Sequence, residues 1–326
     1  MTVYSTITFG DTSGDLTRHQ RAGDQVLAPP TVNTQTVVGD ANALLDHARG
    51  GNDDVTSFGN AAASAFGDAL TIADHAIGGS DHVVVGATNQ AEAYGDAANL
   101  EGHGRGGDDT IDVESAFSAT GFGDAQTMTD HAHGGNDTLT GSSFHGGLAL
   151  YGDALNMSGH ALGGDDVLTN GGRGGTLYGD AQTLSGHAHG GDDRLVGVSA
   201  PAGQGQTTLY GDGQQLLDRA VGGNDTLVSG ADAPDTMYGD AATVAPGAHT
   251  GADTFVFAPS NGQDQIMDFE PGKDHIELDG LGFANFQDLE SHFQDTAQGT
   301  LISFDANDSI LVAGVHHLSQ SDFVLI

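Results

Sequence analysis

Gly-Asp dipeptides recur along the chain about once every twenty-eight positions, and a second aspartate follows each of them after thirteen positions. The steps between successive Gly-Asp pairs vary between twenty-seven and thirty-two positions, but the inner spacing of thirteen is the same in all eight repeats. A regular period of this length indicates a stack of similar units, each of which buries its apolar side only against its neighbours. The period therefore predicts a solenoid.

Two columns of aspartates define the repeat. The first, named the Gly-Asp column, contains Asp40, Asp68, Asp96, Asp124, Asp153, Asp180, Asp212 and Asp240. The second, named the Gly-Gly-x-Asp column, contains Asp53, Asp81, Asp109, Asp137, Asp166, Asp193, Asp225 and Asp253. Most of these second aspartates follow a Gly-Gly pair, whose second member is Gly51, Gly79, Gly107, Gly135, Gly164, Gly191 or Gly223.

Apolar residues share the same period. An aromatic residue usually precedes the Gly-Asp pair, as Tyr94 does; Leu100 stands four positions after the aspartate, and Ile111 stands two positions after the second one. Several glycines per repeat argue against helices, because each costs a helix interior about 1 kcal/mol relative to alanine. Short β-branched or aromatic runs between Gly, Asp and Asn instead predict strands of three to five residues in parallel sheets, with coils about 4.8 Å apart. The expected fold class is an all-β solenoid.

Both ends depart from the repeat. Asp11 lies twenty-nine positions before Asp40, and Asp24 follows it after thirteen positions with Val26 two further on, so we expect a ninth, degenerate coil. Residues 1–36 are predicted to form this capping coil, residues 37–250 the repeats, and residues 251–326 a C-terminal β-rich cap. Within the cap, residues 255–257, 266–269, 275–278, 300–304 and 309–312 read as strands, and residues 285–294 read as a short helix.

Composition narrows the partners. The chain has 45 acidic and 8 basic residues, a formal net charge of -37, so nucleic acid and anionic membrane surfaces are not expected partners. The absence of cysteine excludes disulfides, thiolate zinc sites and a cysteine nucleophile. No segment approaches the roughly 18 consecutive apolar residues of a membrane helix, and the first residues lack the features of a secretory signal peptide.

The Gly-Gly-x-Asp turns carry the chemistry. Glycines allow a tight turn that exposes carbonyl oxygens, and the aspartate adds a charged oxygen, as in Gly134-Gly135-Asn136-Asp137. Stacked turns of this kind offer six or more oxygens between coils, which suits calcium better than the stricter octahedral magnesium. The Gly-Asp column is a second candidate set of metal ligands, although an aspartate in a Gly-rich turn is also a common turn former.

These turns resemble the calcium-binding nonapeptide Gly-Gly-x-Gly-x-Asp-x-(apolar)-x of the RTX family. Residues 132–140 match its Gly, Asp and apolar positions, with Ala-His in place of the first Gly-Gly. The segment from residue 251 to residue 326 is similar to RTX C-terminal caps through GADTFVF and the final Asp-Phe-Val-Leu-Ile. The resemblance implies a right-handed parallel β-roll or β-helix, several calcium ions in the turns, and bacterial type I secretion read from the C-terminus. An RTX coil is usually built from two nonapeptides, whereas each longer coil here has one such turn and one degenerate half.

No catalytic motif is evident, because the sequence lacks HExxH, Gly-x-Ser-x-Gly and a phosphate loop followed by lysine. We therefore predict a secreted, extracellular or cell-surface protein with a structural, adhesive or matrix role and no catalysis of its own. A cell-surface or extracellular polysaccharide and the type I secretion machinery are its expected partners. A calcium-dependent polysaccharide lyase or epimerase, or its accessory binding module, is the alternative.

A histidine column follows the Gly-Asp aspartates at seven positions. It contains His47, His75, His103, His131, His160 and His187, and continues with Arg219 and Gly247. A transition-metal ladder is conceivable, since imidazole suits zinc, copper and nickel. The favoured interpretation is a stack of turn side chains bonded to a neighbouring aspartate or carbonyl.

Overall fold

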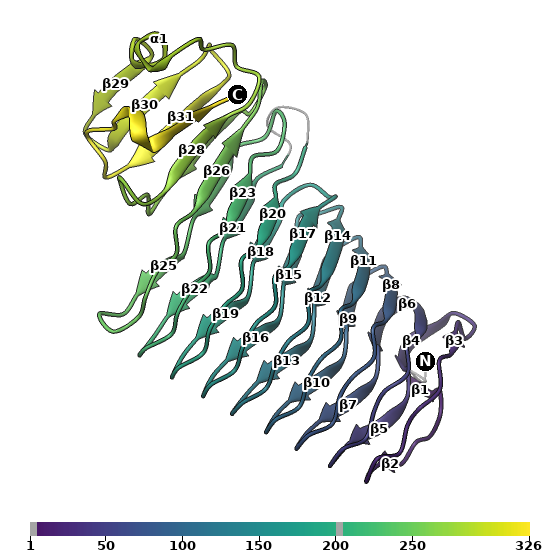
Figure 1. Ribbon diagram of the computed structural model, residues 1–326. Helices are drawn as coiled ribbons and strands as arrows, with labels where there is room; N and C mark the ends of the chain where they lie inside the picture. Colours follow the sequence, from purple (N-terminus) through teal and green to yellow (C-terminus); the bar gives the residue numbers. More distant parts are fainter. Residues whose placement is uncertain (1–4, 200–204) are drawn as a thin grey trace.

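The computed structural model describes residues 5–199 and 205–326, which form nine stacked coils followed by a small cap (Figure 1). Nearly all regular structure is β, as the period predicted, and the coils lie side by side along one axis. Each coil has a short strand after its Gly-Asp pair, a strand after its second aspartate and a strand that leads to the next Gly-Asp pair. The solenoid prediction is confirmed.

The short strands after the Gly-Asp pairs form a nine-stranded parallel sheet. They are β2 (Asp15–Leu16), β5 (Ala41–Leu44), β7 (Ala69–Ile72), β10 (Ala97–Leu100), β13 (Ala125–Met128), β16 (Ala154–Met157), β19 (Ala181–Leu184), β22 (Gly213–Leu216) and β25 (Ala241–Val244). Equivalent repeat positions pair, such as Leu100 with Met128.

The other two strands of each coil belong to a sheet of 23 strands. Those after the second aspartates are β3 (Val26–Leu27), β6 (Asp54–Phe66), β8 (His82–Ala87), β11 (Thr110–Ser115), β14 (Thr138–Ser143), β17 (Val167–Asn170), β20 (Arg194–Val196), β23 (Thr226–Val228) and β26 (Thr254–Phe257). Those that lead to a Gly-Asp pair are β1 (Ser5–Phe9), β4 (Val32–Val38), β9 (Gln90–Tyr94), β12 (Ser118–Phe122), β15 (Leu148–Tyr151), β18 (Gly175–Tyr178), β21 (Thr207–Tyr210) and β24 (Asp235–Tyr238). In the last coil β27 (Gln263–Ile266) takes this place, but Met267-Asp268 follows it instead of a Gly-Asp pair. Strand β6 has 13 residues, longer than the expected three to five, because it continues through the corner and pairs with both β8 and β9.

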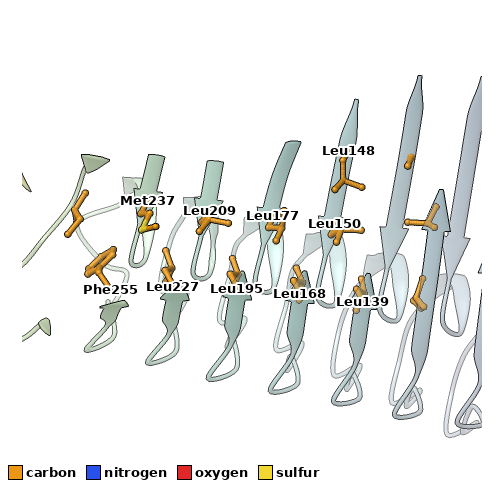
Figure 2. Packing of buried hydrophobic residues seen from close by; sticks show 14 of the residues in the cluster. Leu139, Leu148, Leu150, Leu168, Leu177, Leu195, Leu209, Leu227, Met237 and Phe255 are labelled. Atoms are coloured by element: carbon orange, nitrogen blue, oxygen red, sulfur yellow. The ribbon is translucent and has the colours of Figure 1, made fainter. Parts of the chain in front are cut away.

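The apolar columns form the core. Leu139, Leu168, Leu195 and Leu227 follow second aspartates and pack as one row against a facing row that includes Leu177 (Figure 2). The apolar residues four positions after the Gly-Asp aspartates fill a separate cluster beneath the nine-stranded sheet. The aromatic residues that precede the Gly-Asp pairs stack from coil to coil with ring centroids 4.4–5.1 Å apart. Each column therefore buries itself by stacking, which explains why it recurs in sequence.

The first coil is present, but its register differs from the expectation. Strands β1, β2 and β3 pair with β4, β5 and β6. Val26 pairs with Asp54 rather than with the next residue, so Gln25 and not Asp24 occupies the position of the second aspartate. The N–H of Gln25 accordingly donates to the second aspartate of the next coil at 2.8 Å. One extra residue in the turn after Asp11 shifts the register, so the prediction for Asp24 was wrong.

The cap follows the sequence with two departures, and the first is the helix expected at 285–294: it ends at Glu290, and Phe293 and Gln294 belong to a strand instead. The cap contains β28 (His275–Leu278), α1 (Phe286–Glu290), β29 (Phe293–Thr296), β30 (Gly299–Ser303), β31 (Ser309–Ala313), a 3-10 turn (Gln320–Asp322) and β32 (Phe323–Leu325). The strand expected at 266–269 ends at Ile266, because the carboxylate of Asp268 instead accepts the N–H groups of Gly239 and Asp240. Strands β29, β30 and β31 pair antiparallel, unlike the coils. No helix among the described residues is long and apolar enough to cross a membrane.

Candidate metal centre

Both aspartate columns are buried. All sixteen side chains have 3 % or less of their surface exposed. Each Gly-Asp aspartate directly precedes a strand of the nine-stranded sheet, and each second aspartate directly precedes a strand of the larger sheet. Burying so many carboxylates is costly unless each is hydrogen-bonded and paired with a cation.

In the Gly-Gly-x-Asp column, one oxygen is satisfied and the other is not. The N–H of Asp109 donates to Oδ1 of Asp137 at 2.7 Å, and the N–H of Asp137 donates to Oδ1 of Asp166 at 2.7 Å. The same bond links every pair of neighbouring coils from Asp53 to Asp253. The Oδ2 atom of all eight second aspartates is buried and has no hydrogen-bond partner.

The Gly-Asp column is built in a related way. The N–H of the second glycine of the pair, eleven positions onward, donates to the carboxylate, as Gly135 does to Asp124 at 2.9 Å. A buried carboxylate oxygen without a partner remains at Asp40, Asp124, Asp153, Asp180 and Asp212. This column therefore forms turns, as the sequence suggested, and also presents free oxygens.

The repeated glycines leave room that these oxygens line. A Cβ on Gly134 would lie 2.2 Å from both Asp124 Oδ2 and Asp153 Oδ1, which belong to successive coils. A Cβ on Gly123 would lie 2.1 Å from Oδ2 of Asp137 and 1.7 Å from the carbonyl oxygen of Gly152. The two columns and the glycine carbonyls thus share one oxygen-lined lane along the stack.

The electrostatics of this lane oppose full ionisation. Burial raises the pKa of Asp40 to about 6, and burial together with the charge of Asp40 raises the pKa of Asp53 to about 8. In the middle of the stack, burial and then the charges of Asp124, Asp109 and Asp166 hold the pKa of Asp137 well above its ordinary value. Like charges at close range cannot all be ionised without a counter-ion.

The donor set fits calcium. Among residues 5–199 and 205–326, no three His, Cys, Asp or Glu side chains form a group that could hold a metal by themselves. A bound ion would therefore need backbone carbonyls beside the carboxylates, and mixed carboxylate and carbonyl coordination is what calcium accepts. The unpartnered Oδ2 atoms and the space left by the glycines are both consistent with such an ion.

Side-chain donors stand near both ends of the lane. In the first coil, Nε2 of Gln25 donates to Oδ1 of Asp11. Beyond the last Gly-Asp aspartate, the ammonium of Lys273 contacts Glu270 at 2.5 Å and also Thr250. Burial lowers the pKa of Lys273, but its hydrogen bond to Glu270 and the charge of Asp240 raise it above the ordinary value. The repeat pattern gave no indication of either contact.

The histidine column is a surface ladder. His47, His75, His103, His131, His160 and His187 are exposed and stack with centroids 4.8–5.1 Å apart, and His19 extends the ladder. The column stacks as predicted, but ring-on-ring contact, not a bond to aspartate, is its main interaction.

Sequence reasoning missed a further set of buried carboxylates in the last coils. Asp264 accepts hydrogen bonds from Asn261, Ser229 and the N–H of Asp235, all at 2.8 Å. Burial raises the pKa of Asp264 to about 7. Because both oxygens of Asp264 have donors, we assign this carboxylate a structural role. The repeat pattern could not identify it, because Asp264 does not recur in the other coils.

Residues 106–325 match the family described as Peptidase M10 serralysin C terminal. The match covers more than half of the chain and includes several coils and the cap. This domain is the non-catalytic repeat part of serralysin-type proteins, and RTX-type repeats of this kind bind calcium. No curated protein matched the chain. Together with the stacked coils and their carboxylate lane, this places the chain in the serralysin C-terminal family of RTX-type calcium-binding repeats.

Proposed function

We propose that calcium ions bind in the oxygen-lined lane, between successive coils, and that the chain folds when they bind. The ligands would be the carboxylates of both columns, from Asp40 to Asp253, with carbonyl oxygens of the neighbouring glycines. Calcium would supply the positive charge that the buried carboxylates lack. The observation that carries this proposal is the row of eight buried Oδ2 atoms without a donor.

Side-chain donors mark the two ends of the lane. Gln25 supplies an amide where the other coils supply a carboxylate, and Lys273 supplies an ammonium near Asp240. The Gln25 position itself would therefore need no calcium, whereas the last coil keeps the unpartnered Oδ2 of Asp253 and would hold the final ion before Lys273. The residues around Lys273 would mark where the metal-binding repeats pass into the cap, near the boundary proposed at 250.

Calorimetric titration of the EDTA-treated chain with calcium, followed in parallel by circular dichroism, tests this function. We expect several ions to bind cooperatively and β-sheet signal to appear with them, because neighbouring coils share each site. Magnesium at equal concentration should produce little change. A chain that keeps the same spectrum in EDTA and in calcium would contradict the proposal.

For the wider role, we propose a protein secreted by bacterial type I secretion, with its signal in residues 251–326 and a structural, adhesive or matrix function. Serralysin-type RTX domains are typically exported by this route. A calcium-dependent polysaccharide lyase or epimerase is the second candidate. Incubation of the calcium-loaded chain with alginate and polygalacturonate separates the two, since an enzyme would change the viscosity or uronate composition and a scaffold would not.

A further inference from the structure

In the eight repeats from Asp40 onward, all length variation falls at one corner of the coil; the first coil, with its extra residue after Asp11, is the exception. From a second aspartate to the next Gly-Asp aspartate the spacing varies from fourteen positions (Asp166 to Asp180) to nineteen (Asp193 to Asp212), whereas the rest of each coil keeps thirteen. The variable segment is the corner where strands such as β11 and β14 end and strands such as β12 and β15 begin. In repeat proteins, variation confined to one corner identifies the face on which function can differ from coil to coil.

The exposed phenylalanines of the described chain lie at this same corner. Phe58, Phe117 and Phe144 are 45 %, 53 % and 58 % exposed, although neighbouring coils have small or polar residues there. The guanidinium of Arg173 lies 4.3 Å above the ring of Phe144, and His145 stacks on Phe117 at 4.6 Å. These contacts hold two of the rings in place, and stacking of this kind cannot be explained by core packing.

Two shallow grooves lie beside these rings. The larger, about 450 Å³, is lined by Glu114, Ser115, Ser142, Ser143, Phe144 and Arg173, among others. The smaller, about 260 Å³, contains Phe58 and Thr140 and shares Glu114 and Ser142 with the first. The shared residues make one groove that crosses several coils, at right angles to the strands.

The lining has the chemistry that recognises a sugar chain. Hydroxyl and carboxylate groups can bond ring hydroxyls, and the exposed aromatic faces can cover the apolar faces of the sugar rings. A protein partner would need a larger and more apolar surface than this glycine- and serine-rich floor offers. A polyanion is disfavoured by Glu114 and by the net charge of -37.

We propose that this groove binds a neutral polysaccharide, laid across the coils over Phe58 and Phe144, with Phe117 next to the lining residue Ala116. The groove would then supply the partner for the adhesive role proposed above, and it uses none of the residues of the carboxylate lane. The two proposals can therefore fail separately.

Affinity electrophoresis of the full chain in calcium buffer tests the groove. The gels would contain hydroxyethylcellulose, xylan, galactomannan or dextran, with alginate as the anionic comparison. We expect at least one neutral polymer to retard the chain. Phe144→Ala and Phe58→Ala, which remove the two rings that line the groove, should each weaken this retardation about tenfold, as expected for aromatic anchors of an interface. Ile7→Ala is the matched control, because Ile7 is 57 % exposed but lies on β1, away from the groove.

Circular dichroism of every variant in calcium shows whether the coils are intact, so loss of folding is not read as loss of binding. Retardation by none of the neutral polymers would overturn the proposal. Retardation that Phe144→Ala and Phe58→Ala leave unchanged would also overturn it. So would retardation by alginate alone, which would indicate calcium bridging to a polyanion.

Discussion

The interior of the carboxylate lane and its two ends differ in how the buried negative charge of the aspartates is compensated. In the interior, Asp137 and its neighbours keep a buried oxygen with no donor. At the N-terminal end an amide of Gln25 meets the carboxylate of Asp11, and at the other end the ammonium of Lys273 lies near Asp240. Where the chain supplies its own donor, we expect no ion; where it repeats a carboxylate with an unpartnered oxygen, we expect a cation. The ends thus have side-chain donors near their carboxylates, which the interior lacks.

The largest expected effect is the pH dependence of the calcium-free chain. The pKa of Asp40 is raised from 3.8 to about 6 and that of Asp53 to about 8, so the folded state favours the protonated forms. Their contribution to stability is therefore present below about pH 4 and is lost as pH rises through 6 and then 8. In EDTA we expect a β-sheet spectrum near pH 5 that disappears by pH 8 and returns on addition of calcium.

The interior carboxylates cause this behaviour, so calcium should reverse its direction. The calcium-loaded chain should lose stability on acidification, because protons displace the ions. A calcium-free chain that is as well folded at pH 8 as at pH 5 would show that the interior needs no counter-ion, and the distinction from the ends would disappear.

A matched pair of glycines tests the packing side of the comparison. Gly135 in the interior and Gly23 in the first coil occupy equivalent positions. A Cβ on Gly135 would lie 1.5 Å from the carbonyl oxygen of Gly107, but a Cβ on Gly23 meets nothing within 4 Å. Gly135→Ala should destabilise the calcium-loaded chain by roughly 1–3 kcal/mol, and Gly23→Ala by no more than about 0.5 kcal/mol. Thermal unfolding in calcium measures both, and equal effects would contradict the tight interior lane.

The interior was predictable from sequence because stacking makes every structural requirement recur. Columns such as those of Leu139 and Tyr151 appear at fixed spacing because each residue packs on its own counterpart. The stack and its two aspartate columns were therefore recognisable without coordinates. The sequence could not show which oxygen of Asp137 lacks a donor, because that depends on a hydrogen bond from the preceding coil.

The ends were not predictable in the same way, since each occurs once. A single inserted residue after Asp11 moved Gln25 into the position that spacing alone gave to Asp24. The position of Lys273 depends on a single turn at Glu270, to which both its backbone N–H and its ammonium bond. The repeat period also gave no indication of the exposed phenylalanines at the variable corner, because Phe117 and Phe144 do not recur in the other coils.

Replacing one interior carboxylate with an amide imitates the N-terminal end. In Asp166→Asn the remaining Oδ1 can still accept the N–H of Asp137, and the new amide replaces the unpartnered oxygen. We expect at least one calcium fewer by calorimetry. At calcium tenfold above the site constant, this loss costs about 1.4 kcal/mol. The calcium-free chain should instead become more stable, since one buried charge is removed.

The adjacent Asp165 provides the control. It is exposed and its carboxylate has a donor in the next coil. Asp165→Asn should leave the calcium count unchanged. If Asp165→Asn and Asp166→Asn lose the same number of ions, the binding is a property of surface charge and not of the buried lane.

The smallest expected effect concerns the C-terminal end. Lys273 is one-third exposed, so solvent screens its interactions and Lys273→Met should lower stability by no more than about 1 kcal/mol. Its informative readout is the ion count. If the ammonium substitutes for an ion, Lys273→Met should bind one calcium more than the parent chain, and Lys273→Arg, which keeps the charge, should not. An unchanged count in Lys273→Met would mean that the ammonium does not substitute for an ion. Lys273 would then form only a surface ion pair with Glu270, and the geometry of the turn near Glu270 would end the lane.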